Sequence, residues 1–385
     1  MALAMAGGIG ARQSEIYSVA RLAGADPRRT ATGVAERLDE DVVIGEGLML
    51  RLPPFRYYAP RSLDDALRIL SDHGPEAQIV AGGTDLYPKM KRRQIEPRVL
   101  VGVRSIPELS RITWMERDGV TLGAGITLAR VLAHEDLAVA YPALARACAV
   151  IAHPPIRSMG TIGGNLCVDT RCTYYDQTFF WREALGFCLK KDGTVCPVAP
   201  GGTRCWAVSS SDGAPVMIAL GAMLRLVGPR GERMIAAEEF YRDDGIQYLA
   251  KAPEEILVEV MLPREEGWKS TYWKLRRRGA IDFPVLGVAV AMRMESGRCW
   301  DARIVLGAVG SCPKRIREAE DILKGNPLEP DVIEAAARVV SRVIRPLENA
   351  DFLHLYRKKM ASVFTQRALR ELTGGLSEGE VPCHN

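Results

Sequence analysis

The chain has 385 residues, of which 47% are hydrophobic and 25% charged, with 51 Lys and Arg against 47 Asp and Glu and a formal net charge of +4. This length is too great for one core of typical size, so two or three domains are expected. The small net charge and the interspersed acidic and basic residues argue against a nucleic-acid-binding protein, and the basic clusters at 89–93 and 276–278 are interpreted as local anion contacts or solvated faces.

Residues 1–48 are rich in Gly, Ala, Arg and acidic residues and show no sustained apolar period. They are predicted to be a disordered or non-native extension, because this composition buries too little to offset chain entropy. The first residues of the chain are weakly apolar but are interrupted by charged residues at Arg12, Glu15 and Arg21. This pattern argues against a secretory signal. The sequence also lacks a run of about 18 apolar residues, the length of a membrane helix. A cytoplasmic protein without a membrane partner is therefore expected.

The next segment alternates helix and strand patterns. Ser62 to Asp65 form a capping box, and apolar residues at 63, 66, 67 and 70 then predict a helix that ends before Gly74. A helix is also predicted at 142–151, and short strands are predicted at 78–81, 99–103 and 120–122. These spacings favour an α/β domain.

The residue pattern changes in the second half of the chain. A helix at 215–220 and a strand at 222–227 come first. Four strands are then predicted, at 256–262, 270–275, 285–294 and 299–309, and two helices follow at 329–343 and 350–372. Strands followed by helices are typical of a separate α+β domain.

Two glycine-rich loops are candidates for binding a diphosphate. They are Ala81-Gly82-Gly83-Thr84-Asp85-Leu86 and Met159-Gly160-Thr161-Ile162-Gly163-Gly164-Asn165. Adjacent glycines allow backbone N–H groups to approach a diphosphate without an intervening Cβ. The first loop alone could be an ordinary turn after a strand, but the pair favours two sides of one nucleotide diphosphate. Neither loop has the dinucleotide or triphosphate motif.

Five of the nine cysteines lie between residues 167 and 205. In a reducing compartment such a cluster binds metal more often than it forms disulfides. The stretch lacks the Cys-x-x-Cys knuckles of zinc sites, and the gaps between Cys172, Cys188, Cys196 and Cys205 are 16, 8 and 9 residues. A four-iron cluster, zinc and unlinked structural thiols all remain possible on spacing alone. The aromatic residues between the cysteines are expected to form a small local core.

The two glycine loops carry a family resemblance. AGGTDL, followed some eighty residues later by TIGGN, resembles the FAD-binding subunits of the molybdenum hydroxylases, such as those of carbon monoxide dehydrogenase and xanthine dehydrogenase. Those proteins pass directly from the second loop to a Ser-Asp-x-x-Pro stretch, whereas this chain inserts about 40 residues. The inserted sequence resembles one member, the β subunit of 4-hydroxybenzoyl-CoA reductase, which carries an extra [4Fe–4S] cluster there.

The resemblance implies site residues. It places the cluster ligands at Cys172, Cys188, Cys196 and Cys205, and leaves Cys167 as the spare cysteine. It implies FAD contacts at Ala81, Gly82, Gly83, Thr84, Asp85, Leu86, Thr161, Gly163, Gly164, Asn165, Asp212 and Lys274. No catalytic residue is expected on this chain.

The resemblance also implies an α+β fold with domain boundaries. A two-lobed α/β FAD-binding domain is expected at 49–228, with the iron–sulfur insertion at about 167–207. A connecting segment is expected at 229–268, a smaller C-terminal domain with an antiparallel sheet and helices at 269–375, and a tail at 376–385.

The implied function is electron transfer within a 4-hydroxybenzoyl-CoA reductase-like complex. Expected partners are a molybdopterin-containing large subunit, a small subunit with two [2Fe–2S] clusters and ferredoxin as the electron donor, in a dimer of heterotrimers. Two alternatives remain. One is the FAD subunit of an oxidative molybdenum hydroxylase for another aromatic or N-heterocyclic compound, and the other is a zinc-stabilised nucleotide-binding protein without redox activity.

Overall fold

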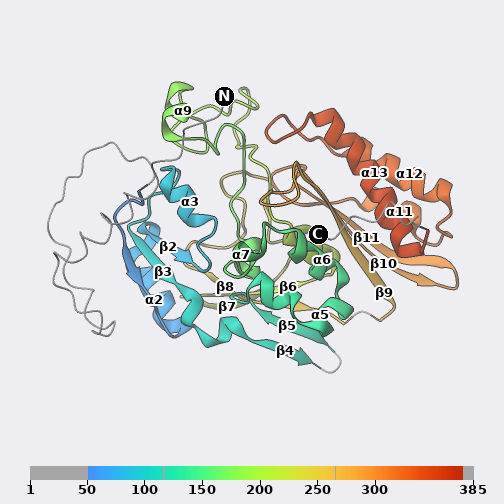
Figure 1. Ribbon diagram of the computed structural model, residues 1–385, viewed down its shortest axis with the longest axis horizontal. Helices are drawn as coiled ribbons and strands as arrows, with labels where there is room; N and C mark the ends of the chain where they lie inside the picture. Colours follow the sequence, from blue (N-terminus) through green and yellow to red (C-terminus); the bar gives the residue numbers. More distant parts are fainter. Residues whose placement is uncertain (1–50, 116–117, 265, 376–385) are drawn as a thin grey trace, which may run out of the picture. The chain divides into compact units, whose positions relative to one another are not determined.

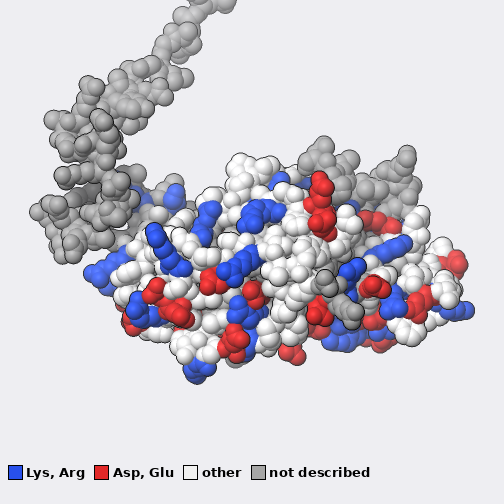
Figure 2. Space-filling model, turned by 90° about the horizontal axis from the view of Figure 1, so that it is seen from below, with Lys and Arg blue, Asp and Glu red and all other residues white. Residues whose placement is uncertain are grey.

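The computed structural model describes residues 51–115, 118–264 and 266–375, all within a unit that begins at Met49 (Figure 1). The predicted extension 1–48 and the predicted tail 376–385 lie outside these described residues. Within the described part, no helix is both long and apolar enough to cross a lipid bilayer. On the face shown in Figure 2, Lys and Arg lie among Asp and Glu, as expected from the interspersed charges of the sequence.

The first lobe contains a parallel sheet in the order β1-β3-β2. Its strands are β1 (Arg56–Tyr58), β2 (Ala77–Val80) and β3 (Val99–Gly102). The helix α2 (Leu63–His73) packs on this sheet through an apolar face made by Ala66, Leu67 and Leu70. Ser62 begins the helix, and its hydroxyl oxygen accepts the N–H of Asp65 at 3.1 Å. This confirms the predicted helix and its cap.

The second lobe is built on an antiparallel sheet in the order β4-β5-β8-β6-β7. Its strands are β4 (Ile112–Met115), β5 (Gly119–Gly123), β6 (Met223–Gly228), β7 (Gly231–Ala236) and β8 (Ile256–Leu262). The segment 229–268, expected to connect two domains, therefore supplies β7 and β8 to this sheet. β8 pairs with β5 on one side and with β6 on the other, and five of its seven residues are buried.

Outside the insertion 167–207, six short helices lie between β5 and β6 in the sequence, and two of them, α6 and α10, pack against C-terminal strands. They are α4 (Leu128–Leu132), α5 (Glu135–Ala140), α6 (Pro142–Val150), α7 (Pro154–Arg157), α8 (Ile162–Leu166) and α10 (Gly213–Ala219). Every residue of α10 is buried, as expected for a helix that is apolar on all sides. It contacts α6, α8 and three C-terminal strands.

The C-terminal part is an antiparallel sheet with helices on one face (Figure 1). The sheet order is β12-β11-β10-β9, with β9 (Trp268–Leu275), β10 (Leu286–Glu295), β11 (Arg298–Gly307) and β12 (Lys314–Arg315). The helices are α11 (Arg317–Leu323), α12 (Pro330–Val343) and α13 (His354–Thr373). Their apolar faces and the sheet form a second core. The predicted α+β fold, with an antiparallel sheet and helices in its C-terminal domain, is confirmed.

The insertion 167–207 has little regular structure apart from the helix α9 (Phe179–Ala184). Its two ends meet where Arg171 and Val208 pair in a β-bridge. The expected aromatic core is only partly present, since Tyr175 is buried but Phe180 is 58% exposed. A segment this short cannot enclose all of its large side chains by itself.

Candidate functional site

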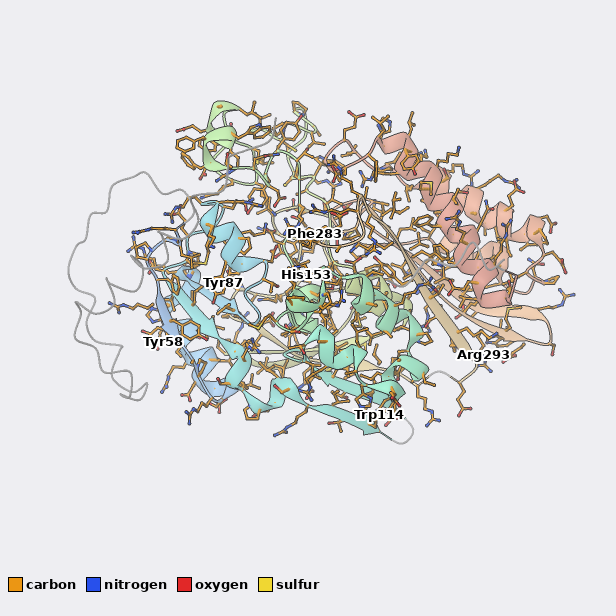
Figure 3. All side chains as sticks on the ribbon, in the orientation of Figure 1. Tyr58, Tyr87, Trp114, His153, Phe283 and Arg293 are labelled. Carbon is orange, nitrogen blue, oxygen red and sulfur yellow. The ribbon has the colours of Figure 1, made fainter. Side chains whose placement is uncertain are left out.

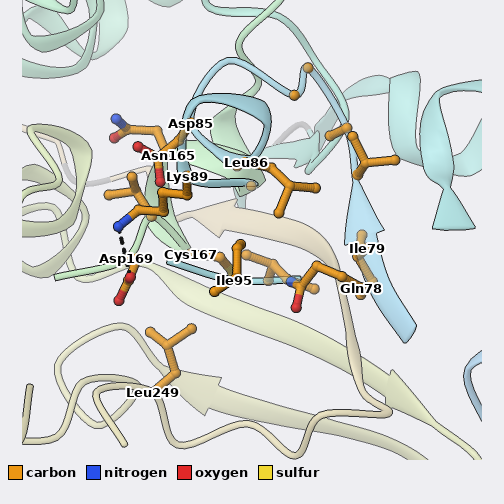
Figure 4. A pocket seen from close by; sticks show the side chains of 18 of the residues that line it. Gln78, Ile79, Asp85, Leu86, Lys89, Ile95, Asn165, Cys167, Asp169 and Leu249 are labelled. Carbon is orange, nitrogen blue, oxygen red and sulfur yellow. Dashed lines mark hydrogen bonds and ion pairs between the residues drawn. The ribbon is translucent and has the colours of Figure 1, made fainter. Parts of the chain in front are cut away.

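The two glycine loops lie against each other on the wall of one cavity of about 1660 Å³ (Figure 4). A Cβ added to Gly82 would lie 2.2 Å from the carbonyl oxygen of Met159, so the first loop packs directly on the segment that leads into the second. Typical small-molecule sites measure about 300–1,000 Å³. The cavity therefore has room for a dinucleotide.

The first loop turns the chain sharply from β2 into the helix α3 (Leu86–Lys91). Gly83 has a φ of +69°, a conformation that glycine adopts without strain. A Cβ at Gly83 would also lie 2.2 Å from the ring of Tyr87, a residue of α3 that Figure 3 labels. The glycine thus permits the turn that brings Thr84 and Asp85 to the cavity.

The second loop is held in place by its own side chains. The hydroxyl oxygen of Thr161 accepts the N–H of Gly164 at 3.0 Å and caps α8. The side-chain oxygen of Asn165 accepts the hydroxyl of Ser211 at 2.9 Å and the N–H of Gly213 at 3.0 Å. The loop is therefore tied to the start of α10. A Cβ at Gly164 would meet only the Thr161 oxygen, at 3.0 Å, so the approach to this glycine is otherwise open.

All the predicted flavin-contacting residues line this cavity except Lys274. Asp212 lines it and accepts hydrogen bonds from the hydroxyl of Tyr272 at 2.7 Å and from Nζ of Lys274 at 2.9 Å. Lys274 also donates to the carbonyls of Val150 and Asp282, and its side chain is 1% exposed. Burial raises the pKa of Asp212, and the Lys274 ammonium opposes this shift. Lys274 therefore supports Asp212 instead of lining the cavity.

A loop after β9 forms another part of the wall, at Ile281, Asp282 and Phe283. The N–H of Ile281 donates to the carbonyl of Ala152 at 3.2 Å. Ile281 has a φ of +56°, which is unusual for a β-branched residue. The C-terminal domain thus contributes to the cavity together with the two glycine loops.

Buried lysines lie beside the cavity and share one carboxylate. Nζ of Lys89 is 2.9 Å from Asp169, as the dashed line in Figure 4 marks, and Nζ of Lys190 is 2.6 Å from the same residue. Burial alone would favour the protonated carboxyl, but Lys190 and Lys89 lower the pKa of Asp169 below its usual range. Lys89 belongs to a cluster expected to be solvated or to make local anion contacts, and it is only 2% exposed.

A second set of ion pairs links the first glycine loop to the cysteine region. Arg171 forms ion pairs with Asp85 and, at 3.0 Å, with Asp176. Asp176 in turn accepts the backbone N–H of Cys172 at 3.0 Å. Burial raises the pKa of Asp85, and Arg171 opposes that shift. The cavity wall and the first cysteine are therefore connected through Arg171 and Asp176.

The four cysteines implied as ligands line one small buried cavity, separate from the large one. They are Cys172, Cys188, Cys196 and Cys205, each less than 9% exposed. Cys167 does not line this small cavity and lies on the wall of the large one. A Cβ at Gly245, which follows the insertion by many residues, would lie 2.6 Å from Sγ of Cys205.

The thiols of this small cavity are strongly buried. Burial raises the pKa of Cys172 to about 12, and it also raises the pKa of Cys205, where Lys190 opposes the shift. Loss of these protons must therefore accompany metal binding, because thiolates are the metal ligands. Among the described residues, no three His, Cys, Asp or Glu groups are arranged to hold a single metal ion.

Sequence reasoning missed several residues of the site. Asp169, Arg171, Tyr175 and Lys190 line the large cavity and were not assigned to it. They lie in the insertion, and their contacts with α3 join residues about 80 positions apart, as in the bond from Lys89 to Asp169. The spacing of residues within a short segment gives no indication of contacts between positions so far apart.

Two families of known proteins match the chain. Residues 53–265 match the FAD binding domain in molybdopterin dehydrogenase, and residues 270–372 match the CO dehydrogenase flavoprotein C-terminal domain. The boundary between them follows β8, in agreement with the observed sheets.

Individual proteins show the same similarity. The chain is 31% identical to the carbon monoxide dehydrogenase medium chain of Afipia carboxidovorans, over 82% of this chain and 95% of that protein. It is 28% identical to the nicotine 6-hydroxylase medium subunit of Paenarthrobacter nicotinovorans, over 84% and 98%. Its structure resembles that of a Cu,Mo-CO dehydrogenase with a TM-score of 0.70 and 29% identity, over 85% of this chain and 100% of the other.

Proposed function

This chain belongs to the FAD-binding subunits of the molybdenum hydroxylase family, and we propose that it is the electron-transfer subunit of a 4-hydroxybenzoyl-CoA reductase-like complex. In this proposal it holds FAD and one [4Fe–4S] cluster. FAD supplies one- and two-electron chemistry when bound. The chain itself supplies the binding site and the charges around it.

The large cavity supports the proposed FAD contacts. Backbone N–H groups of the two glycine loops would hold the diphosphate, since Gly164 carries no Cβ to block its approach and Gly82 allows the first loop to pack on Met159. Asp212, which lies at the same cavity and is held by Tyr272 and Lys274, would orient the flavin end. The observation that supports these assignments is that both glycine loops line the same cavity.

The proposed cluster rests on one observation: the four implied ligands line a single buried cavity, and the spare Cys167 does not. Four thiolates can hold a [4Fe–4S] cluster from its perimeter. A zinc ion would instead require its ligands to converge on one point at about 2.3 Å. Among the described residues no three such groups converge in that way, which argues against the zinc alternative.

The proposed electron route enters at the cysteine cavity. Electrons from ferredoxin would pass to the cluster, then to FAD, and leave through the [2Fe–2S] clusters of a small subunit to the molybdopterin-containing large subunit. The reaction there would be the reductive dehydroxylation of 4-hydroxybenzoyl-CoA to benzoyl-CoA. We place this complex in the cytoplasm, where the thiols remain reduced, as a dimer of heterotrimers.

The names of the relatives favour a second candidate. Carbon monoxide dehydrogenase and nicotine 6-hydroxylase are named for oxidative reactions, so the chain would then be the FAD subunit of an oxidative hydroxylase for another aromatic or N-heterocyclic compound. The cysteine-lined cavity argues for the reductive complex, because an added low-potential centre offers an entry point for electrons.

Cysteine substitution tests the cluster. Ser at Cys172, Cys188, Cys196 or Cys205 should lower iron and acid-labile sulfide strongly, because a hard oxygen ligand suits this cluster poorly. Cys167→Ser is the matched control and should retain both. Zinc instead of iron in anaerobically prepared wild-type protein would refute the cluster.

The direction of electron flow needs a separate measurement. The complete complex should accept electrons from reduced ferredoxin, and the four ligand variants should lose this activity while an artificial dye still reduces the flavin. Equal reduction by ferredoxin in the Cys188→Ser variant and the wild type would favour the oxidative alternative.

A further inference from the structure

Two side chains belong to both cavities. Tyr175 and Lys190 line the large cavity and also the small cysteine cavity. Tyr175 is 3% exposed, and the side chain of Lys190 is 7% exposed. These residues therefore form a shared, dry wall between the two sites.

The Lys190 ammonium is fixed in this wall by three acceptors. It lies 2.6 Å from Asp169, 2.6 Å from the hydroxyl oxygen of Thr170 and 2.5 Å from the carbonyl oxygen of Gly245. Asp169 also accepts from Lys89 at 2.9 Å, and Lys89 lies 3.8 Å from a second carboxylate, that of Asp176. Of these two ammonium groups, only that of Lys190 belongs to a residue lining the cysteine cavity.

The ring of Tyr175 is held between the same two lysines. Nζ of Lys89 is 4.6 Å and Nζ of Lys190 is 4.9 Å from the ring centroid. Cations at these distances are attracted to an aromatic face. Lys89 lines only the large cavity, so Lys190 is the lysine that faces the cysteines.

We propose, on the basis of the function proposed above, that Lys190 is a positioning residue whose charge raises the reduction potential of the centre held by the four cysteines. Reduction adds one negative charge to that centre, and a fixed cation in a low-dielectric wall stabilises the added charge. Tyr175 and Lys190 would separate the two groups, so that transfer of one electron across this wall would oxidise the centre and reduce the flavin by one electron each.

The test is an EPR-monitored redox titration of the purified complete complex. Lys190→Met should make the midpoint potential of the iron–sulfur centre more negative. A tenfold change in its one-electron equilibrium corresponds to about 59 mV. Lys190→Arg should remain near the wild-type value. Asp169→Asn removes the shared carboxylate and should shift the potential in the opposite direction, to a more positive value.

Lys191→Met is the matched control. Lys191 is the next residue, its side chain is 34% exposed, and it pairs with Asp192 at 3.0 Å. Its loss should shift the potential less than the loss of Lys190, because this side chain is half-buried, does not line the cysteine cavity and is in contact with solvent that screens its charge. If Lys190→Met loses its iron, the direction in which Asp169→Asn shifts the midpoint potential tests the proposal: a more positive potential supports it, and a more negative one refutes it.

Two results would overturn this inference alone: an unshifted potential in Lys190→Met with its iron retained, or shifts of the same sign in Lys190→Met and Asp169→Asn. Iron and acid-labile sulfide in the wild type are measured first. Their absence would refute the proposed function itself, so the two failures are distinguishable.

Discussion

Gly245 is not part of a recognisable sequence motif, yet it lies directly against a sulfur of the cysteine cavity. A Cβ at this position would lie 2.6 Å from Sγ of Cys205 and 2.7 Å from the backbone nitrogen of Ala207. Gly245→Ala should therefore displace the sulfur, at a cost of about 1–3 kcal/mol for overpacking, and lower the iron content per chain. Gly201→Ala is the control in the insertion, because a Cβ there meets nothing within 4 Å. Equal iron in both variants would contradict the close packing of Gly245 on Cys205.

Gly164 offers the cleanest test of the diphosphate site. A Cβ there meets only the hydroxyl oxygen of Thr161. The free energy of unfolding should therefore change by less than about 1 kcal/mol, the range of helix propensities. The added side chain would instead block the approach of the diphosphate. FAD content after gel filtration should fall in Gly164→Ala and further in Gly164→Val. A substitution at Gly83 is less informative, because its positive φ and its contact with Tyr87 also penalise the fold.

A site residue can be predicted from the sequence when the pattern that marks it lies in neighbouring positions of the chain. The glycine loops are contiguous motifs, and the residues assigned from them line the cavity. Lys89 and Lys190 meet at Asp169 from different parts of the chain, and nothing in their neighbourhoods marks them as buried. Lys274 is predicted to contact the flavin, but it does not line the cavity, and three acceptors, Asp212 among them, hold its ammonium group.

At the scale of elements, periodicity predicted the strands well but not their partners. The predicted strand 256–262 is β8, yet its place beside β5 depends on pairing Val120 with Leu262. Contacts so distant in sequence leave no local trace, which is why the segment before Trp268 was predicted to connect domains. The helix α11 and the strand β4 were not predicted because they are short and only weakly periodic.

The insertion is the element that sequence reasoning described least well. Its cysteines were recognised, but its wall of charged residues on the large cavity was not. The electrostatic links run from Asp85 through Arg171 to Asp176 and the backbone of Cys172. The insertion is therefore part of the large site and not an appendage beside it.

At the scale of the whole molecule, the C-terminal domain also holds the insertion. Asn349 lies after α12 and is 3% exposed. Its carbonyl accepts the N–H of Thr173 at 3.1 Å, and its side-chain amide donates to the carbonyl of Trp206. Thr173 and Trp206 each follow one of the implied ligands directly in the sequence. One residue of a distant domain thus fixes both ends of the cysteine region.

Asn349→Ala should therefore weaken the cysteine site from outside it. The substitution leaves the partly buried carbonyl of Trp206 without its donor, which costs at most about 1–3 kcal/mol, and frees one end of the region that positions Cys205. Iron content and the melting temperature should both fall. Asn326→Ala is the matched control, since its side chain bonds the carbonyl of Ile322 at an exposed place in the same domain. Normal iron in Asn349→Ala, or an equal loss in Asn326→Ala, would show that the C-terminal domain does not position the cysteines.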